Sequence, residues 1–225
     1  MLRPRNGLFD LLRAAPVGCL LASLIFQALP AQQLTHGPIA GGVTASSARF
    51  YVRVDTAAEV NIQLSTSPLF TPPLIQGSAQ PAGQANDHAV LLRIDGLKAN
   101  QRYFYRAVIN GQPVREVPPR QFQTFPPPGS RQTFTFTFGS CQQVMPWQSR
   151  PDAGQAYRAM LVDQPRFYLQ IGDWGYPDTT DSEKGDPLNF FSLDPRRIQA
   201  SYRAKYAADY PLSDLLKIAP IDYVY

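Results

Sequence analysis

Two short polar motifs follow apolar stretches in the second half of the chain. Cys141 ends Phe-Gly-Ser-Cys after the aromatic stretch 133–138, and Asp173 and Tyr176 lie in Gly-Asp-Trp-Gly-Tyr after the stretch 167–171. Parallel α/β sheets bind ligands beyond the carboxyl ends of their strands, so adjacent strands would bring Cys141 and Asp173 close together. A thiolate, a carboxylate and a phenol suit a ferric ion, and the carboxylate can bridge to a harder cation such as calcium.

Simpler interpretations of these motifs stay open. A Gly-Asp pair after a strand is often a plain turn, and a free cysteine is commonly a small buried apolar residue. Ser140 beside Cys141 would suit a nucleophile at a strand-to-helix turn, but such a site needs a base. The two histidines, His36 and His88, both fall in the first half of the chain, where we expect solvated loops. A nucleophilic triad is therefore disfavoured.

The elements that position the motifs are predicted to be strands alternating with helices. The stretches 133–138 and 167–171 are apolar enough for buried strands, and a third strand begins at Ile221. Between them the pattern is helical. Strand–helix–strand order is the signature of a parallel α/β sheet.

Three helices are expected in this part. Asp152 is suited to cap a helix that runs through Leu161. Asp194-Pro195 opens the next helix, with aspartate at the cap and proline in the first turn, and Ser213 starts a short third one. The middle helix repeats apolar residues every four positions, which is typical of a core-facing stripe; they are Ile198, Tyr202 and Tyr206.

The chain from Thr35 to Phe125 is predicted to be all-β. Apolar and polar residues alternate with a period of two, as half-buried strands require, over 49–54, 60–65 and 89–94. Asn110-Gly111 after a further apolar segment predicts a hairpin. Leu97 followed six residues later by Tyr103 resembles the tyrosine corner of immunoglobulin-like sandwiches, and the surrounding residues are similar to a fibronectin type III domain.

Residues 1–31 are predicted to be a secretory signal peptide. Three arginines precede an apolar run from Val17 to Leu29, which is too short for a comfortable membrane span. An uncleaved N-terminal anchor is the alternative. We expect an exported protein, periplasmic or extracellular, with no membrane span once the signal is removed. Cys19 would leave with the signal, so Cys141 would be unpaired in the mature chain.

The bulk composition excludes some classes of function. The formal net charge is only +4 and no Lys/Arg run is present, so a nucleic-acid-binding patch is not expected. The 22 prolines among 225 residues disfavour an all-helical fold. Three consecutive prolines in 126–130 indicate a semi-rigid linker between two domains. No feature of the sequence indicates an oligomeric state.

The order of these motifs resembles the start of the PhoD-like alkaline phosphatases, which belong to the calcineurin-like metallophosphoesterases. The matching features are a loosely similar opening stretch at 37–51, the Leu–Tyr corner, Phe-Gly-Ser-Cys at 138–141, Gly-Asp-x-x-Tyr-x-Asp at 172–178, and spaced tyrosines before a hydrophobic strand. The resemblance implies an all-β fibronectin type III-like sandwich over 35–125, the linker, and an incomplete α/β domain of metallophosphoesterase type over 131–225.

The same resemblance implies the chemistry. Cys141 and Tyr176 would ligate iron and Asp173 would bridge iron to calcium, so the cofactors would be Fe³⁺ and Ca²⁺ and the substrate a phosphate monoester or diester. The family's next motif, Asp-Asp-His, would begin where this sequence ends at Tyr225. We therefore expect a truncated phosphoesterase that is inactive as given. The rival hypothesis is a non-enzymatic exported binding protein built on the β-sandwich; an Asp-Asp-His run downstream of Tyr225 would favour the enzyme.

Overall fold

The computed structural model describes residues 33–142, 154–174, 193–208 and 210–224. The predicted signal peptide, Asp152 and Tyr176 lie outside these ranges. Everything below concerns the unit Gln32–Tyr225. Among the described residues, no helix combines the length and the apolar character needed to cross a membrane.

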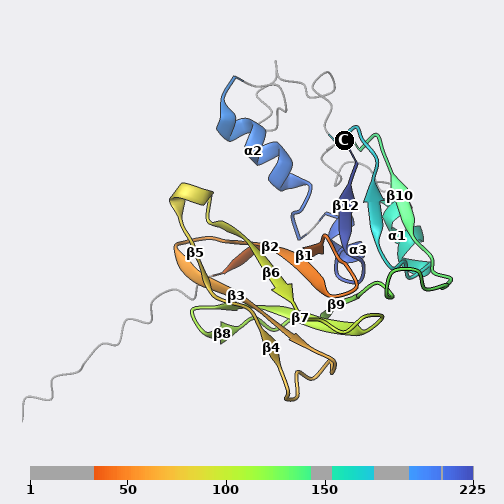
Figure 1. The fold of residues 1–225 in the computed structure, drawn as a ribbon. Helices are drawn as coiled ribbons and strands as arrows, with labels where there is room; N and C mark the ends of the chain where they lie inside the picture. The colour runs from red at the N-terminus through yellow and green to blue at the C-terminus, as the bar shows by residue number, and fades with distance from the viewer. Residues whose placement is uncertain (1–32, 143–153, 175–192, 209, 225) are drawn as a thin grey trace, which may run out of the picture. The chain divides into compact units, whose positions relative to one another are not determined.

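Two antiparallel sheets form the region from residue 34 to residue 123, called the antiparallel region below (Figure 1). The first sheet has the order β1 (Leu34–Gly41), β2 (Ser47–Val54), β6 (Ala89–Asp95). The second is built on β3 (Ala58–Ser65) and β7 (Arg102–Ile109). Shorter elements complete it: β4 (Ile75–Gln76), β5 (Gln80–Ala82) and β9 (Arg120–Gln123) pair at its edges, β8 (Gln112–Pro113) follows β7, and a 3-10 turn spans Gln84–Asn86.

One hydrophobic core lies between the two sheets. Alternate residues of β2 and β3 are fully buried, as their period of two predicted. The Phe50 ring lies 5.1 Å from that of Tyr105 and 5.6 Å from that of Phe122, measured between centroids. The predicted segments 49–54, 60–65 and 89–94 all fall inside observed strands, so the strand prediction is confirmed.

Two local contacts predicted from sequence are present. Asn110 and Gly111 connect β7 to β8 with φ angles of 47° and 78°, the left-handed values that a tight hairpin needs. The Tyr103 hydroxyl accepts a hydrogen bond from the Lys98 backbone N–H at 2.9 Å, and Leu97 is buried beneath this connection. The phenol thereby ties the loop before β7 to the strand.

Replacing Tyr103 by phenylalanine is expected to lower the free energy of unfolding by about 1–2 kcal/mol, because the Lys98 N–H loses its partner while the ring packing is kept. Urea unfolding measures the change. Tyr202→Phe is the matched control, since Tyr202 is 45% exposed, and its effect should stay within about 0.5 kcal/mol. Equal losses in the two variants would show that the corner contact contributes nothing specific.

A parallel three-stranded sheet follows, with the order β10 (Thr137–Gly139), β11 (Tyr168–Gln170), β12 (Ile221–Tyr223). Helix α1 (Gln155–Val162) connects the first two strands, and α2 (Pro195–Ala204) and α3 (Leu212–Leu215) precede the third. The strands are in parallel register, with Gly139 opposite Gln170 and Gln170 opposite Tyr223. The predicted strand–helix–strand arrangement is therefore confirmed.

Several predicted boundaries were wrong. Within the stretch 133–138, regular strand structure begins only at Thr137 and continues to Gly139. Before it, the Thr135 carbonyl accepts a hydrogen bond from the Arg166 N–H, in the segment that leads into β11. Helix α1 begins after Gly154, in the left-handed conformation, and not after a capping Asp152. Helix α3 starts at Leu212, with Ser213 inside it. The Asp194 cap of α2 is confirmed, since its carboxylate accepts from Arg196 N–H at 3.0 Å.

The buried face of α2 also differs from the prediction. Ser201 and Lys205, at the end of the helix, are fully buried, whereas Tyr202 is 45% exposed. Of the expected stripe of Ile198, Tyr202 and Tyr206, Tyr206 packs against the core whereas Tyr202 does not. A polar pair occupies the buried face because the lysine finds partners inside the protein.

Candidate metal centre

The structure brings Cys141 and Asp173 together at the carboxyl edge of the parallel sheet. The Cys141 thiol lies 3.4 Å from Asp173 Oδ2 and donates a hydrogen bond to it. The backbone N–H of Gln142 also donates to the Asp173 carbonyl at 2.9 Å, so the loops after β10 and β11 are bonded directly. The predicted proximity of the two side chains is confirmed.

The donor set and its spacing fit a metal ion. With metal–sulfur and metal–oxygen distances of about 2.3 and 2.1 Å, two ligands of one ion lie roughly 3.1–3.6 Å apart. The observed sulfur–oxygen distance of 3.4 Å falls in this range. Both side chains are exposed, so Cys141 is not the buried apolar residue of the simpler interpretation. Within the described ranges, no three His, Cys, Asp or Glu side chains group as a complete site.

Both candidate ligands have a left-handed backbone. Cys141 has φ 58° and Asp173 has φ 52°. Non-glycine residues in this region cost on the order of 1–3 kcal/mol and persist where the surrounding structure enforces them, often at functional sites. The strand before Cys141 is also tightly packed, because a Cβ at Gly139 would lie 2.8 Å from the Tyr168 hydroxyl. The loop conformations are therefore held by tertiary contacts.

Gln142, the residue after Cys141, is the centre of a buried polar network. It is 7% exposed, its side-chain oxygen accepts from the Tyr157 hydroxyl of α1, and its amide nitrogen donates to the Tyr210 hydroxyl at 2.8 Å. Burial raises the pKa of Tyr157 and of Tyr210. Both phenols therefore stay neutral at ordinary pH and can keep these hydrogen bonds.

The loop after β11 is supported in the same way. The Tyr168 hydroxyl donates to Gln170 Oε1 at 2.6 Å, and Gln170 Nε2 donates to the Gly172 carbonyl at 2.6 Å. A chain of hydrogen bonds thus runs from the strand interior to the residue before Asp173. Buried networks of this kind restrict the conformations open to the groups that they hold.

Lys205 is the residue of this site that the sequence did not reveal. Its Nζ donates to the Gln142 carbonyl at 2.6 Å and lies 4.7 Å from the centroid of the Trp174 ring. Burial lowers the pKa of the Lys205 ammonium to about 7. The sequence hints at its burial only by placing it four residues after Ser201, on the same side of a helix. The helix carries several arginines as well, and such a pattern normally indicates a solvent-exposed face.

The histidines lie elsewhere. His36 is on strand β1, half-buried and not in a solvated loop as expected; burial, followed by the nearby Arg53 and Arg203 guanidinium groups, lowers its pKa. His88 directly precedes β6 in a turn. Neither belongs to the parallel sheet or to its connecting helices. This agrees with the view that no histidine base serves Ser140.

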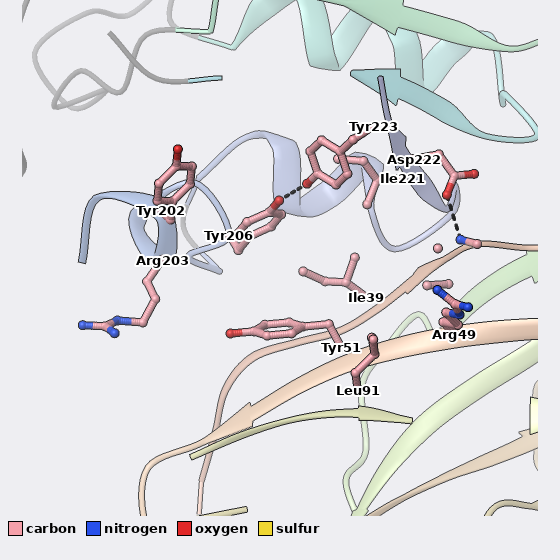
Figure 2. A pocket seen from close by; sticks show the side chains of 13 residues that line it. Ile39, Arg49, Tyr51, Leu91, Tyr202, Arg203, Tyr206, Ile221, Asp222 and Tyr223 are labelled. Carbon is pink, nitrogen blue, oxygen red and sulfur yellow. Dashed lines mark hydrogen bonds between the residues drawn. The ribbon is translucent and has the colours of Figure 1, made fainter. Parts of the chain in front are cut away.

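The structure also has a cavity of about 490 Å³ (Figure 2). It lies between β1 and β2 on one side and α2 and β12 on the other. Most of its lining is apolar or aromatic: Ile39, Tyr51, Leu91, Tyr202, Tyr206, Ile221 and Tyr223, with Arg49, Arg203 and Asp222 as the charged members. The Tyr206 and Tyr223 hydroxyls are hydrogen-bonded, and both rings pack against Trp174, at 5.9 and 5.5 Å between centroids.

Fold and site together define an antiparallel β-region joined to a parallel α/β sheet that carries a thiol–carboxylate pair at its carboxyl edge. Residues 20–126 match the model of the PhoD-like phosphatase N-terminal domain. The chain therefore carries the N-terminal part of a PhoD-like phosphatase. None of the curated proteins matches this sequence.

Among the solved structures, that of PhoD agrees with the family at the level of the fold. The structure of PhoD is 22% identical with a TM-score of 0.65, and the match covers 83% of this chain and 37% of that one. This chain therefore spans little more than a third of PhoD. The sensor domain of the anti-sigma factor RsgI4 in Pseudobacteroides cellulosolvens matches 46% of the chain and 99% of its own, at 16% identity and a TM-score of 0.33. A fibronectin type III domain of the human KIAA0970 protein matches over 44% of this chain and 78% of its own length, at 9% identity and a TM-score of 0.31.

Proposed function

We propose that this chain is the N-terminal part of an exported phosphoesterase with a binuclear iron–calcium centre. The observation that carries the proposal is the Cys141 thiol 3.4 Å from the Asp173 carboxylate at the carboxyl edge of a parallel sheet. Cys141 and Tyr176 would bind Fe³⁺, and Asp173 would bridge it to Ca²⁺. Such ions polarise a phosphoryl group and stabilise the charge that develops on its oxygens.

The residues around the pair fit this role. Both side chains face solvent, so a metal ion and a phosphate ester can reach them. The neighbouring buried network supports the two loops through the side chains of Gln142 and Gln170. A thiolate and a carboxylate also provide two of the negative charges that a trivalent ion requires. The remaining ligands would come from residues downstream of Tyr225.

The finer assignments belong to the same proposal. Residues 1–31 would be a signal peptide, which makes the protein periplasmic or extracellular. Residues 35–125 would be a fibronectin type III-like sandwich, a likeness that the Tyr103 hydrogen bond supports. Residues 126–130 would be the linker, and 131–225 the first part of a metallophosphoesterase domain. The substrate would be a phosphate monoester or diester.

Replacing Cys141 by serine is expected to abolish iron binding, because a hydroxyl is a poor substitute for a thiolate at a transition metal. The full-length protein, extended to include the ligands proposed downstream of Tyr225, is loaded with Fe³⁺, desalted and assayed for iron by elemental analysis. Bound iron should fall from about one ion per chain to a small fraction of that. The fold should persist, since Cys141 is exposed.

Cys19→Ser, made in protein that retains residues 1–31, is the matched control, because it removes the other thiol of the 225-residue sequence. It should leave bound iron unchanged. Iron content that is equal in the wild type and in Cys141→Ser would contradict a metal centre at this pair. It would favour the rival hypothesis, in which the antiparallel region binds a partner and the parallel sheet only packs against it.

The chain as given is expected not to hydrolyse phosphate esters, even with iron and calcium supplied. Two-metal catalysis needs both ions held about 3.5–4 Å apart by a closed set of ligands. The sequence offers Cys141 and Asp173 at this edge, Tyr176 three residues after Asp173 in the chain, and no histidine after His88. Release of nitrophenol from a chromogenic phosphodiester is the assay. Metal-dependent turnover that disappears in Asp173→Asn would overturn this expectation.

A further inference from the structure

Lys205 connects the two loops that carry the candidate ligands. It comes from the end of α2, far along the chain from either loop. Its Nζ reaches the loop after β10 through the Gln142 carbonyl, at 2.6 Å, and the loop after β11 through the Trp174 ring, at 4.7 Å from the centroid. These two residues directly follow Cys141 and Asp173.

The position of this lysine is costly for the protein. The residue is fully buried, and a buried lysine is stabilising only where it makes good contacts. Its pKa, lowered by burial to about 7, reflects that cost. An apolar residue would fill the same space without the penalty, so packing alone does not explain a lysine here.

The two loops need an external restraint. Cys141 and Asp173 both adopt left-handed backbone conformations, with φ 58° and 52°, which nearby contacts must enforce. One direct loop-to-loop hydrogen bond is present, from Gln142 N–H to the Asp173 carbonyl at 2.9 Å. Lys205 contacts the donor residue of this bond through the Gln142 carbonyl. It contacts the residue after the acceptor through the Trp174 ring.

We propose that Lys205 is a positioning residue, which clamps the loop after β10 to the loop after β11 and so sets the separation of the Cys141 and Asp173 side chains. It acts through Gln142 and Trp174. The expected effect of Lys205 on metal binding rests on the proposed function, whereas its expected effect on the two loops does not.

Lys205→Met tests the clamp, because methionine keeps the length and apolar volume of lysine but has no donor and no charge. Amide hydrogen exchange is followed in the full chain by NMR. The Gln142 amide should exchange at least 10-fold faster in the variant, since its bond to Asp173 opens more often. The Tyr168 amide, which bonds to the Pro220 carbonyl inside the sheet, should be unchanged. Lys217→Met is the matched control, and neither amide should change in it.

Two outcomes overturn the clamp. An unchanged Gln142 exchange rate would show that Lys205 does not hold the loops. Equal acceleration at Gln142 and Tyr168 would show that it only stabilises the whole sheet. If Lys205→Met does not fold, Trp174→Leu removes the other end of the clamp, and the same pattern at Gln142 and Tyr168 is required of it.

The effect on the ligands is measured in the full-length protein, extended to include the ligands proposed downstream of Tyr225. The probe is Co²⁺, whose thiolate charge-transfer absorption reports a Cys141–metal bond. Lys205→Met should bind Co²⁺ 10–100-fold more weakly with a shifted band, as for other residues that orient metal ligands. Lys217→Met should bind as the wild type does. Unchanged affinity in Lys205→Met overturns the positioning role. If the wild type binds no Co²⁺ while the exchange pattern holds, the metal centre is wrong and the clamp stands.

Discussion

Phe50→Ala should lower the free energy of unfolding of the antiparallel region by about 3–5 kcal/mol, which is enough to unfold many domains of this size. Phe50 is fully buried between the two sheets. Its ring packs against those of Tyr105 and Phe122, so truncation leaves a cavity that neither neighbour can fill without moving. Denaturant unfolding followed by circular dichroism measures the loss.

Phe138→Ala is the matched control for this prediction. Phe138 is 60% exposed on β10 and lies outside the antiparallel core. Its truncation should cost the antiparallel region less than about 0.5 kcal/mol. A loss in Phe50→Ala no larger than in the control would mean that the two sheets do not share a close-packed core.

The stability of the parallel sheet should rise with pH between pH 7 and pH 9, by roughly 2 kcal/mol. Burial lowers the pKa of Lys205 from 10.5 to about 7. In this interval the unfolded chain keeps the lysine proton while the folded chain has lost it, so raising the pH favours folding. Below pH 7 both states are protonated and the slope disappears.

The fluorescence of Trp174 in a Trp147→Phe background reports unfolding of this part, because Trp174 lies against Lys205. Lys205→Met should remove the rise, since methionine does not titrate. Tyr157, Tyr168 and Tyr210 have raised pKa values through burial and remain neutral in the folded state up to pH 9. A slope that persists in Lys205→Met would assign the titration to another group.

Local signals in the sequence predicted most of the elements. The period of two in 49–54 requires one buried face, which fixes a strand wherever that face packs. Asn110-Gly111 accepts the left-handed conformation of a tight turn at low cost, and Asp194-Pro195 satisfies the first backbone donors of a helix. These preferences act between residues a few positions apart, so the sequence alone expresses them.

The edge of the parallel sheet was predictable in part. Cys141 and Asp173 end apolar segments, and parallel register then places both at one edge. Their separation and exposure, and the left-handed backbone of each, could not be predicted. They arise in a tertiary setting that includes the contacts of Lys205 with Gln142 and Trp174, which form only after the strands and α2 have packed together.

The sequence by itself thus determined the antiparallel strands, the parallel order β10–β11–β12 and the identity of two candidate ligands, because each follows from spacing along the chain. Only the tertiary structure decided which face of α2 is buried. Helical periodicity favoured Ile198, Tyr202 and Tyr206. Tyr206 does pack against the core, but Tyr202 is exposed, and Ser201 and Lys205 are the fully buried residues. The reason is that a buried lysine depends on a carbonyl acceptor 63 residues away in the sequence, and no local pattern encodes that contact.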